Sequence, residues 1–304
     1  MELARSLSPN RLEVISADSR QIYRGLDIGT AKPSVEMRAA VPHHLIDIVA
    51  PRDTFSAGDF VRHARQIMRD IWSRGAIGII VGGAAFYVRS LLFGLPETPP
   101  ADAAVRLELK ERAAQLGLGE LYAQLQRLDP ATAARLHRND RSRILRALEI
   151  LATSGQPLSR FRRPIQPPRT GELLLMLLRR PRDLLYQRIE QRVDAMFADG
   201  LVVEVAGLLH AGHDYSTPGL RSIGYAEFFG SRGDFRGEAA QLADVASRIK
   251  GNSRHYAKRQ MTFFRGLPAT QWIDMDDAGV AVQTATSVVR QFLDTRATAL
   301  DSSG

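Results

Sequence analysis

Four polar side chains follow one another early in the chain, at Asp18, Ser19, Arg20 and Gln21. They come directly after the apolar run Leu12–Ala17, which we interpret as a buried strand. In open α/β sheets, binding sites form beyond the carboxyl ends of the strands. A carboxylate there can act as a general base, but an Asp at the end of a strand can equally cap a following helix. These residues alone favour the cap.

The elements that must position this cluster are strands alternating with helices. Short apolar runs predict four strands, at 12–17, 76–81, 173–178 and 270–273. An amphipathic helix is expected over about residues 56–74, between the first two of them. This alternation predicts an α/β fold with a mostly parallel sheet. Gly82 and Gly83 follow the second strand, so we expect them at the same edge as Asp18.

Composition narrows the classes of protein. The chain has 304 residues, with 41 Lys and Arg against 33 Asp and Glu, a net charge of +8. This excess favours an anionic partner, with nucleic acid the first candidate. The sequence has no cysteine, which excludes disulfides and cysteine-ligated zinc. The first ten residues contain no apolar signal core, and the apolar run at 76–88 is too short to span a bilayer. We expect a cytoplasmic protein without a membrane segment.

A second region interrupts the α/β pattern. Pro-rich stretches at 94–102 and 160–171 flank a segment that has no strand signal and is predicted to be helical. From Arg135 to Arg163 this part of the chain contains eight arginines and only two acids, Asp140 and Glu149. We therefore predict an α/β core formed by residues 1–100 and 168–304, with a helical insertion at 101–167.

One helix of the insertion is predicted in more detail. It begins near Asn139 and Asp140, which favour helix N-termini, and Ile144 and Leu148 belong to its apolar stripe. Arg143 and Arg146 lie three residues apart on another face. Two interpretations stay open, because such arginines can form a solvated face or bind an anion.

Six motifs carry a resemblance to a known family. In chain order they are ISADSRQIYRGLDIGTAKPS, PHHLIDIVAP, IVGGAAFYVRSLLFGL, LHRNDRSRILRALEI, LRSIGYAEF and AKRQMTFFRG. From Leu12 to about Asp274 the chain resembles the tRNA dimethylallyltransferases, also called tRNA isopentenyltransferases. The resemblance implies a P-loop-kinase-like core, a helical insertion that grips the anticodon stem-loop of tRNA, and a monomer without an obligate protein partner. The implied reaction moves a dimethylallyl group from dimethylallyl diphosphate to the N6 amine of the adenosine 3′ of the anticodon, with Mg²⁺ present.

The resemblance also assigns roles to residues. Asp18 is implied as the general base, and Arg221 as the cation that faces the diphosphate; Arg24 and Lys32 are weaker candidates. The N6 amine of adenine is a poor nucleophile, so a general base must accept its proton as the new bond forms. An adenine in a folded loop must also leave the base stack before it can react. The implied tRNA contacts are Asp18, Ser19, Arg20, Gln21, Ala84, Arg106, Ser142, Arg143, Arg146, Arg221, Gly224, Tyr225, Lys258, Arg259 and Gln260.

Two groups of neighbouring residues have simpler interpretations than a binding site. On composition alone, Lys258, Arg259 and Gln260 fit a solvated helix end equally well. His43 and His44 are adjacent on a strand-like run, so their side chains should point in opposite directions. We interpret the two histidines as structural and not as a metal pair.

The chain departs from the family at two places. No G-x-x-x-x-G-K-[ST] motif occurs in the sequence, so the first strand and the P-loop of the fold are expected to be absent and the residues that hold the diphosphate and Mg²⁺ are unassigned. An internal start at Met1, a degraded gene copy, or an RNA-binding variant without transfer would each explain this; intact motifs elsewhere favour the first. Ala84 stands where the family has Thr.

Competing functions follow from these features. An adenylate prenyltransferase would share the core, but a free nucleotide does not need an arginine-rich insertion. A catalytically impaired RNA-binding remnant would fit the missing P-loop. A small-metabolite kinase would need that loop and would leave the motif LHRNDRSRILRALE unexplained. The 304 residues by themselves are expected to bind an anticodon stem-loop and to transfer little.

Overall fold

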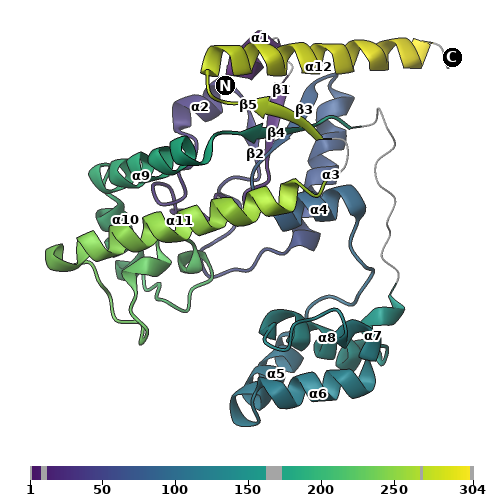
Figure 1. Ribbon diagram of the computed structural model, residues 1–304, viewed down its shortest axis with the longest axis vertical. Helices are drawn as coiled ribbons and strands as arrows, with labels where there is room; N and C mark the ends of the chain where they lie inside the picture. The colour runs from purple at the N-terminus through teal and green to yellow at the C-terminus, as the bar shows by residue number, and fades with distance from the viewer. Residues whose placement is uncertain (1, 8–11, 162–172, 268–269, 302–304) are drawn as a thin grey trace. The chain divides into compact units, whose positions relative to one another are not determined.

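The computed structural model describes residues 2–7, 12–161, 173–267 and 270–301 (Figure 1). The chain divides into two compact units, Met1–Leu92 with Pro168–Gly304, and Phe93–Pro167. The first unit mixes parallel strands with helices, whereas the described part of the second is helical. The predicted α/β class with a helical insertion is confirmed.

The first unit contains a three-stranded parallel sheet. Its strands are β1 (Leu12–Ser16), β2 (His43–His44) and β3 (Ile77–Val81), in the order β2-β1-β3. Ile15 pairs with His44 on one side and with Ile80 on the other. Because all three strands are parallel, their carboxyl ends meet at one edge, where Asp18 and Gly82 follow.

The other two predicted strands form a separate parallel pair. They are β4 (Leu175–Arg179) and β5 (Thr270–Asp274). All described strands are parallel, as expected, but they form two sheets, because β3 and β4 share no backbone hydrogen bonds. Val81 and Leu178 are accordingly more than half exposed. Apolar periodicity identified each strand but carries no information about which strands pair.

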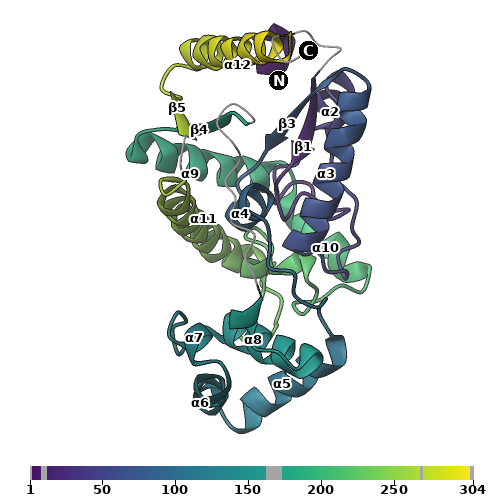
Figure 2. The same ribbon diagram turned by 90° about the vertical axis from the view of Figure 1, so that its right-hand side faces the viewer.

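Helix α3 (Ala57–Ser73) connects β2 to β3 and packs against β1 and β3, as Figures 1 and 2 show. It begins with a capping box in which Ser56 and Asp59 bond each other's backbone N–H groups. Phe60, Ala64 and Ile71 form its buried face. The predicted amphipathic helix is therefore present with the expected bounds.

Further helices complete the first unit. Their bounds are α1 (Glu2–Ser6), α2 (Val35–Ala40), α4 (Ala85–Phe93), α9 (Arg182–Ala198), α10 (Leu201–His210), α11 (Leu242–Phe264) and α12 (Ala278–Asp301). A core joins α10 and α11 to the segments around Leu26 and Tyr225. Helix α12 packs against α1, where the Arg290 side chain donates a 3.0 Å hydrogen bond to the Ser6 carbonyl. No described helix is long and apolar enough to cross a membrane.

The second unit is built from α5 (Ala103–Gln115), α6 (Leu118–Leu128), α7 (Pro130–Ala133) and α8 (Arg141–Ser154). Asp140 caps α8 by accepting a hydrogen bond from the Arg143 N–H, and Gly155 ends it with a φ of 69°. Ile144 and Leu148 lie in the core against Leu121. The predicted start and apolar stripe of this helix are confirmed.

Candidate active site

Asp18 lies immediately beyond the carboxyl end of β1, and its carboxylate is oriented by the backbone that follows. Oδ1 accepts hydrogen bonds from the Arg20 N–H at 2.7 Å and, more weakly, from the Gln21 N–H at 3.4 Å. These bonds cap a turn and not a helix, since the next helix, α2, is capped by Ser34. No described residue donates a hydrogen bond to Oδ2, so this oxygen is available to a substrate.

The Gly82–Ala84 turn lies against the same strand end. The Ala17 N–H donates to the Val81 carbonyl at 2.7 Å, and the Ala84 N–H donates to the Ala17 carbonyl at 3.1 Å. A Cβ atom on Gly82 would come within 2.3 Å of the Ala17 backbone. The absence of a side chain at Gly82 is therefore what lets the two strand ends approach.

Two groups near Asp18 come from distant helices of the same unit. Arg192, on α9, is partly exposed to solvent. Desolvation of its guanidinium lowers the pKa, and the negative charge of Asp18 opposes that shift. Tyr256, on α11, donates its hydroxyl to the Gly83 carbonyl at 3.1 Å. Burial of that hydroxyl and the charge of Asp18 raise the pKa of Tyr256. Arg192 and Tyr256 thus share the electrostatic surroundings of Asp18.

Two further tyrosines are buried around this edge. Tyr23 donates to the Asp53 carbonyl at 3.4 Å, and Tyr87 donates to the Phe55 carbonyl at 3.2 Å. Burial raises the pKa of both phenols, and the charge of Asp18 adds to the shift of Tyr87. Both stay neutral at physiological pH and fix the loops that carry them.

Lys32 and Arg24, the weaker candidates for a phosphate contact, serve the loop itself. The Lys32 ammonium is almost fully buried, where it forms ion pairs with Asp27 and Asp47 and donates to the Tyr23 carbonyl at 2.8 Å. Arg24 donates to the Asp47 carbonyl at 3.4 Å. With two carboxylates as partners, Lys32 stabilises the loop and has little positive charge left for a phosphate.

Gly224 and Tyr225 pack against this loop at Gly29. The Tyr225 hydroxyl donates to Glu204 Oε1 at 2.5 Å, while Glu204 Oε2 accepts the N–H groups of Asp27 and Ile28 at 2.9 and 2.8 Å. The Tyr225 side chain is fully buried, and burial raises its pKa. Gly224 has a φ of 99°, which favours glycine. These two residues therefore fix the backbone beside Arg221.

Most of the remaining candidate residues of the α/β unit are at the surface. Arg221 ends a short 3₁₀ helix, Gly219–Arg221; it is exposed and forms no ion pair with any residue that the structure describes. Lys258 and Arg259 are exposed on α11. Gln260 instead turns inward and donates to the Gly83 carbonyl at 2.8 Å.

In the helical unit, the two arginines of α8 differ in their surroundings. The Arg143 side chain is 74% exposed and pairs with Asp140 at its own helix N-terminus. The Arg146 side chain is 29% exposed, lies 3.0 Å from Glu149 Oε1 and donates to the Pro99 carbonyl at 2.5 Å. Arg106 forms a 2.9 Å ion pair with the same buried Glu149. Arg143 is thus exposed, whereas Arg146 is half-buried and paired with Glu149.

The helical unit has further exposed arginines besides Arg143. Ser142 beside it is exposed, and so are further arginines of the same unit, at positions 135, 138, 141 and 160. None of these four further arginines has an ion pair among the described residues. Arg162 and Arg163, which belonged to the predicted arginine-rich stretch, lie outside the described residues.

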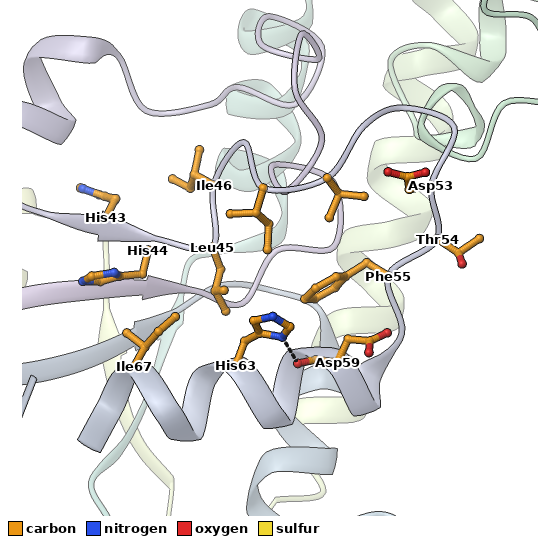
Figure 3. Close-up of a pocket in the computed structure, with 12 residues that line it drawn as sticks. His43, His44, Leu45, Ile46, Asp53, Thr54, Phe55, Asp59, His63 and Ile67 are labelled. Atoms are coloured by element: carbon orange, nitrogen blue, oxygen red, sulfur yellow. Dashed lines mark hydrogen bonds between the residues drawn. The ribbon is translucent and has the colours of Figure 1, made fainter. Parts of the chain in front are cut away.

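A pocket of about 890 Å³ lies between β2 and α3, and Asp18 is not among the residues that line it (Figure 3). His43, His44 and His63 line it, but His44 bonds Glu13 at 2.6 Å and His63 bonds the Asp59 carbonyl at 2.8 Å. Within the described ranges, no three His, Asp or Glu side chains are placed to hold a metal ion. These contacts favour the structural interpretation of His43 and His44, and no protein-only Mg²⁺ site can be assigned.

Comparisons with known proteins decide the family. The family described as IPP transferase matches residues 21–267. The chain belongs to the IPP transferase family. The tRNA dimethylallyltransferase of Geobacter sulfurreducens is 44% identical over 263 residues, which cover 86% of this chain and 83% of the relative. The tRNA dimethylallyltransferase 2 of Geotalea uraniireducens is 46% identical over 267 residues, with 88% and 85% covered.

Solved structures of IPP transferases agree in fold. The tRNA isopentenylpyrophosphate transferase of Bacillus halodurans is 34% identical with a TM-score of 0.66, and the match covers 98% of this chain and 93% of that one. A eukaryotic dimethylallyltransferase acting on tRNA is 25% identical with a TM-score of 0.78, covering 97% and 75%. The predicted family and P-loop-kinase-like fold class are confirmed.

Sequence reasoning missed Arg192, Tyr87 and Tyr256. Arg192 stands in the ordinary helix pattern of α9, and Tyr256 lies two residues before the Lys258–Gln260 triplet. Nothing in the local sequence marks either as a neighbour of Asp18. The one available signal for Tyr256 was its i, i+4 spacing from Gln260, which places both on one face of a helix.

Proposed function

We propose that this IPP transferase moves a dimethylallyl group from dimethylallyl diphosphate to the N6 amine of the adenosine 3′ of the anticodon in tRNA. The observation that carries the proposal is Asp18, whose Oδ1 is fixed by the Arg20 N–H while Oδ2 is left available at the strand edge. A carboxylate held in this way can accept a proton from a bound amine without first giving up another partner.

Asp18 would act as the general base. The adenine N6 forms a bond to C1 of the dimethylallyl group while the bond from C1 to the diphosphate oxygen breaks. The N6 proton passes to Asp18 Oδ2, and the electron pair of the broken bond leaves with the diphosphate. General bases contribute about 10²–10⁴-fold to rates of this kind.

Cations would meet the charge that develops on the leaving diphosphate. Arg221 is exposed and without an ion pair in the described part of the chain, so its charge is available. Arg192 adds a second guanidinium that interacts with Asp18. Mg²⁺, when bound to the diphosphate, would neutralise further charge; the described part of the chain offers no carboxylate cluster for it, so no residue is assigned to hold it.

The tRNA would be held by backbone phosphates on exposed arginines. Arg143 and its exposed neighbours 135, 138 and 141 supply such a surface in the helical unit, and Lys258 and Arg259 supply one on α11. Phosphate contacts position a nucleic acid without reading its sequence. Arg106 and Arg146 support this surface through the buried Glu149.

A single-turnover assay tests the proposal. The protein is mixed with an anticodon stem-loop and labelled dimethylallyl diphosphate, and N6-dimethylallyladenosine is measured after digestion of the RNA, with free AMP as the alternative acceptor. Product on the stem-loop supports the proposed transfer, and product on AMP alone would contradict it in favour of an adenylate prenyltransferase.

A second function, RNA binding without transfer, would need only the exposed arginines of the helical unit and the exposed basic residues of α11. The same assay separates the two, because tight binding of the stem-loop with no product under saturating donor supports binding alone.

A further inference from the structure

Tyr256 has an unusual position among the aromatic side chains around Asp18. Tyr23 and Tyr87 are buried, whereas Tyr256 is 39% exposed. Its phenol end nevertheless points inward, because the hydroxyl donates to the Gly83 carbonyl at 3.1 Å. One end of the ring is therefore anchored in the protein while part of its surface stays open to a ligand.

The ring is held from more than one side. Gln260, one helical turn further along α11, donates to the same Gly83 carbonyl at 2.8 Å. The Arg259 guanidinium lies 5.9 Å from the centre of the Tyr256 ring, within the range of a cation–π contact. An aromatic side chain fixed before binding loses little conformational freedom when a ligand stacks on it.

Tyr256 lies close enough to Asp18, the proposed general base, to be affected by its charge. Both Asp18 and Arg20 contribute to the electrostatic surroundings of its hydroxyl. We propose that the open surface of Tyr256 is the stacking platform for the unstacked purine base on which Asp18 acts. The proposal rests on the function proposed above and adds the group that receives the base once it leaves the RNA stack.

The physical reason is the loss of stacking. A base that leaves a folded loop loses the neighbours on both of its faces, and a fixed aromatic ring replaces one of them. Arg259, on the same ring, would at the same time be close enough to contact the phosphate of that nucleotide. Asp18 could then reach the edge of the base while Tyr256 covers its face.

A thermodynamic cycle tests this pairing. Binding of an anticodon stem-loop is measured by fluorescence anisotropy for the wild type, Tyr256→Phe and Tyr256→Leu. Each is measured with the intact RNA and with an RNA that has an abasic ribose at the target position. With intact RNA, Tyr256→Leu should weaken binding by about 5- to 50-fold, and Tyr256→Phe should stay within about threefold of the wild type because it keeps the ring. With abasic RNA, the effect of Tyr256→Leu should disappear.

Controls keep the result interpretable. Tyr215→Leu changes another exposed tyrosine and should leave both affinities unchanged. If Tyr256→Leu does not fold, as judged by circular dichroism, Tyr256→Met replaces it, since the flexible, unbranched Met side chain adapts to an irregular space and has no ring.

Equal losses on intact and abasic RNA would overturn the platform, and so would a loss by Tyr256→Phe as large as that by Tyr256→Leu. The second result would assign the effect to the hydroxyl and the Gly83 turn. Failure of the wild type to bind the stem-loop would instead contradict the proposed tRNA function and remove the inference with it.

Discussion

The Gln260 amide donates a 2.8 Å hydrogen bond to the Gly83 carbonyl, which fixes helix α11 to the turn that follows β3. A Cβ atom on Gly83 would lie 1.9 Å from Gln260 Nε2, and one on Gly82 would lie 2.3 Å from the Ala17 backbone. The two glycines are thus constrained differently. Gly83 faces the end of the Gln260 side chain, which can rotate away, whereas Gly82 faces the backbone of a strand, which cannot.

Substitution of these glycines should therefore give different losses of stability. Gly83→Ala should lower the free energy of unfolding by about 1 kcal/mol through the lost hydrogen bond. Gly82→Ala should cost about 1–3 kcal/mol or more, because the strand ends must separate. Urea unfolding followed by Trp72 and Trp272 fluorescence measures both, since both tryptophans lie in this unit. In the background of Gln260→Ala, Gly83→Ala should have almost no further effect, and an equal cost in both backgrounds would contradict the contact.

Asp18→Asn should separate catalysis from binding. The amide oxygen can still accept the hydrogen bond from the Arg20 N–H, so the turn is kept while the base is removed. In a protein to which the family's P-loop segment has been restored, we expect the single-turnover transfer rate to fall by about 10²-fold or more, with stem-loop affinity within several-fold of the unsubstituted protein. Near-normal transfer by this variant would remove Asp18 from its proposed role.

Arg221→Ala should lower the transfer rate without a loss of stability. The side chain is exposed and forms no ion pair within the described ranges, so its removal leaves no buried partner. If it meets the leaving diphosphate, the rate should fall by about 10²–10³-fold. Thermal unfolding serves as the control, and a rate equal to that of the wild type would exclude Arg221 from the chemical step.

The two α8 arginines should behave differently when each is changed to Ala. Arg143→Ala should weaken stem-loop binding and reduce the slope of log affinity against log salt by up to about one unit, with unchanged stability. Arg146→Ala should instead destabilise the helical unit, since it leaves Glu149 with one partner fewer. Arg127→Ala, a change of another exposed arginine in the same unit, is the matched control. An unchanged salt slope for Arg143→Ala would favour the interpretation as a solvated face.

Glu149 should make the helical unit sensitive to acid. Burial tends to raise its pKa, but hydrogen bonds from Arg106 and the Asp102 N–H, together with the charge of Arg146, hold the pKa below its usual value. A lowered carboxylate pKa stabilises the fold above the unfolded value of about 4.3, and this stabilisation is lost as the pH falls through the folded pKa.

Glu149→Gln provides the measurement. At pH 7 the variant should be less stable than the wild type by about 3 kcal/mol, because the two arginines lose their counter-charge. As the pH falls below the unfolded value of about 4.3, the difference should shrink, because the stabilisation that Glu149 gives is lost as the pH approaches its lower folded pKa. Urea unfolding followed by circular dichroism at pH 7 and below the unfolded value gives the comparison, and a difference that does not depend on pH would assign the effect to packing.

The sequence by itself determined the local elements and the family. Strands β1 and β3, helix α3 and the start of α8 were predictable because burial repeats with the period of each element, and because Ser56 and Asp140 are typical caps. The six ordered motifs identified the IPP transferase family by sequence alone. They do not show which of their residues contact each other in the fold.

Tertiary structure decided which charges are available and which residues share the site. Lys32 and Arg143 are both basic residues in polar stretches, yet one is buried between two carboxylates and the other is exposed. Arg192 and Tyr256 come close to Asp18 from positions more than 170 residues further along the chain. Periodicity reports only whether a side chain faces the interior, whereas its partners depend on how α9 and α11 pack against the strand edge. That packing is a property of the whole fold, so only the three-dimensional structure could bring these residues together.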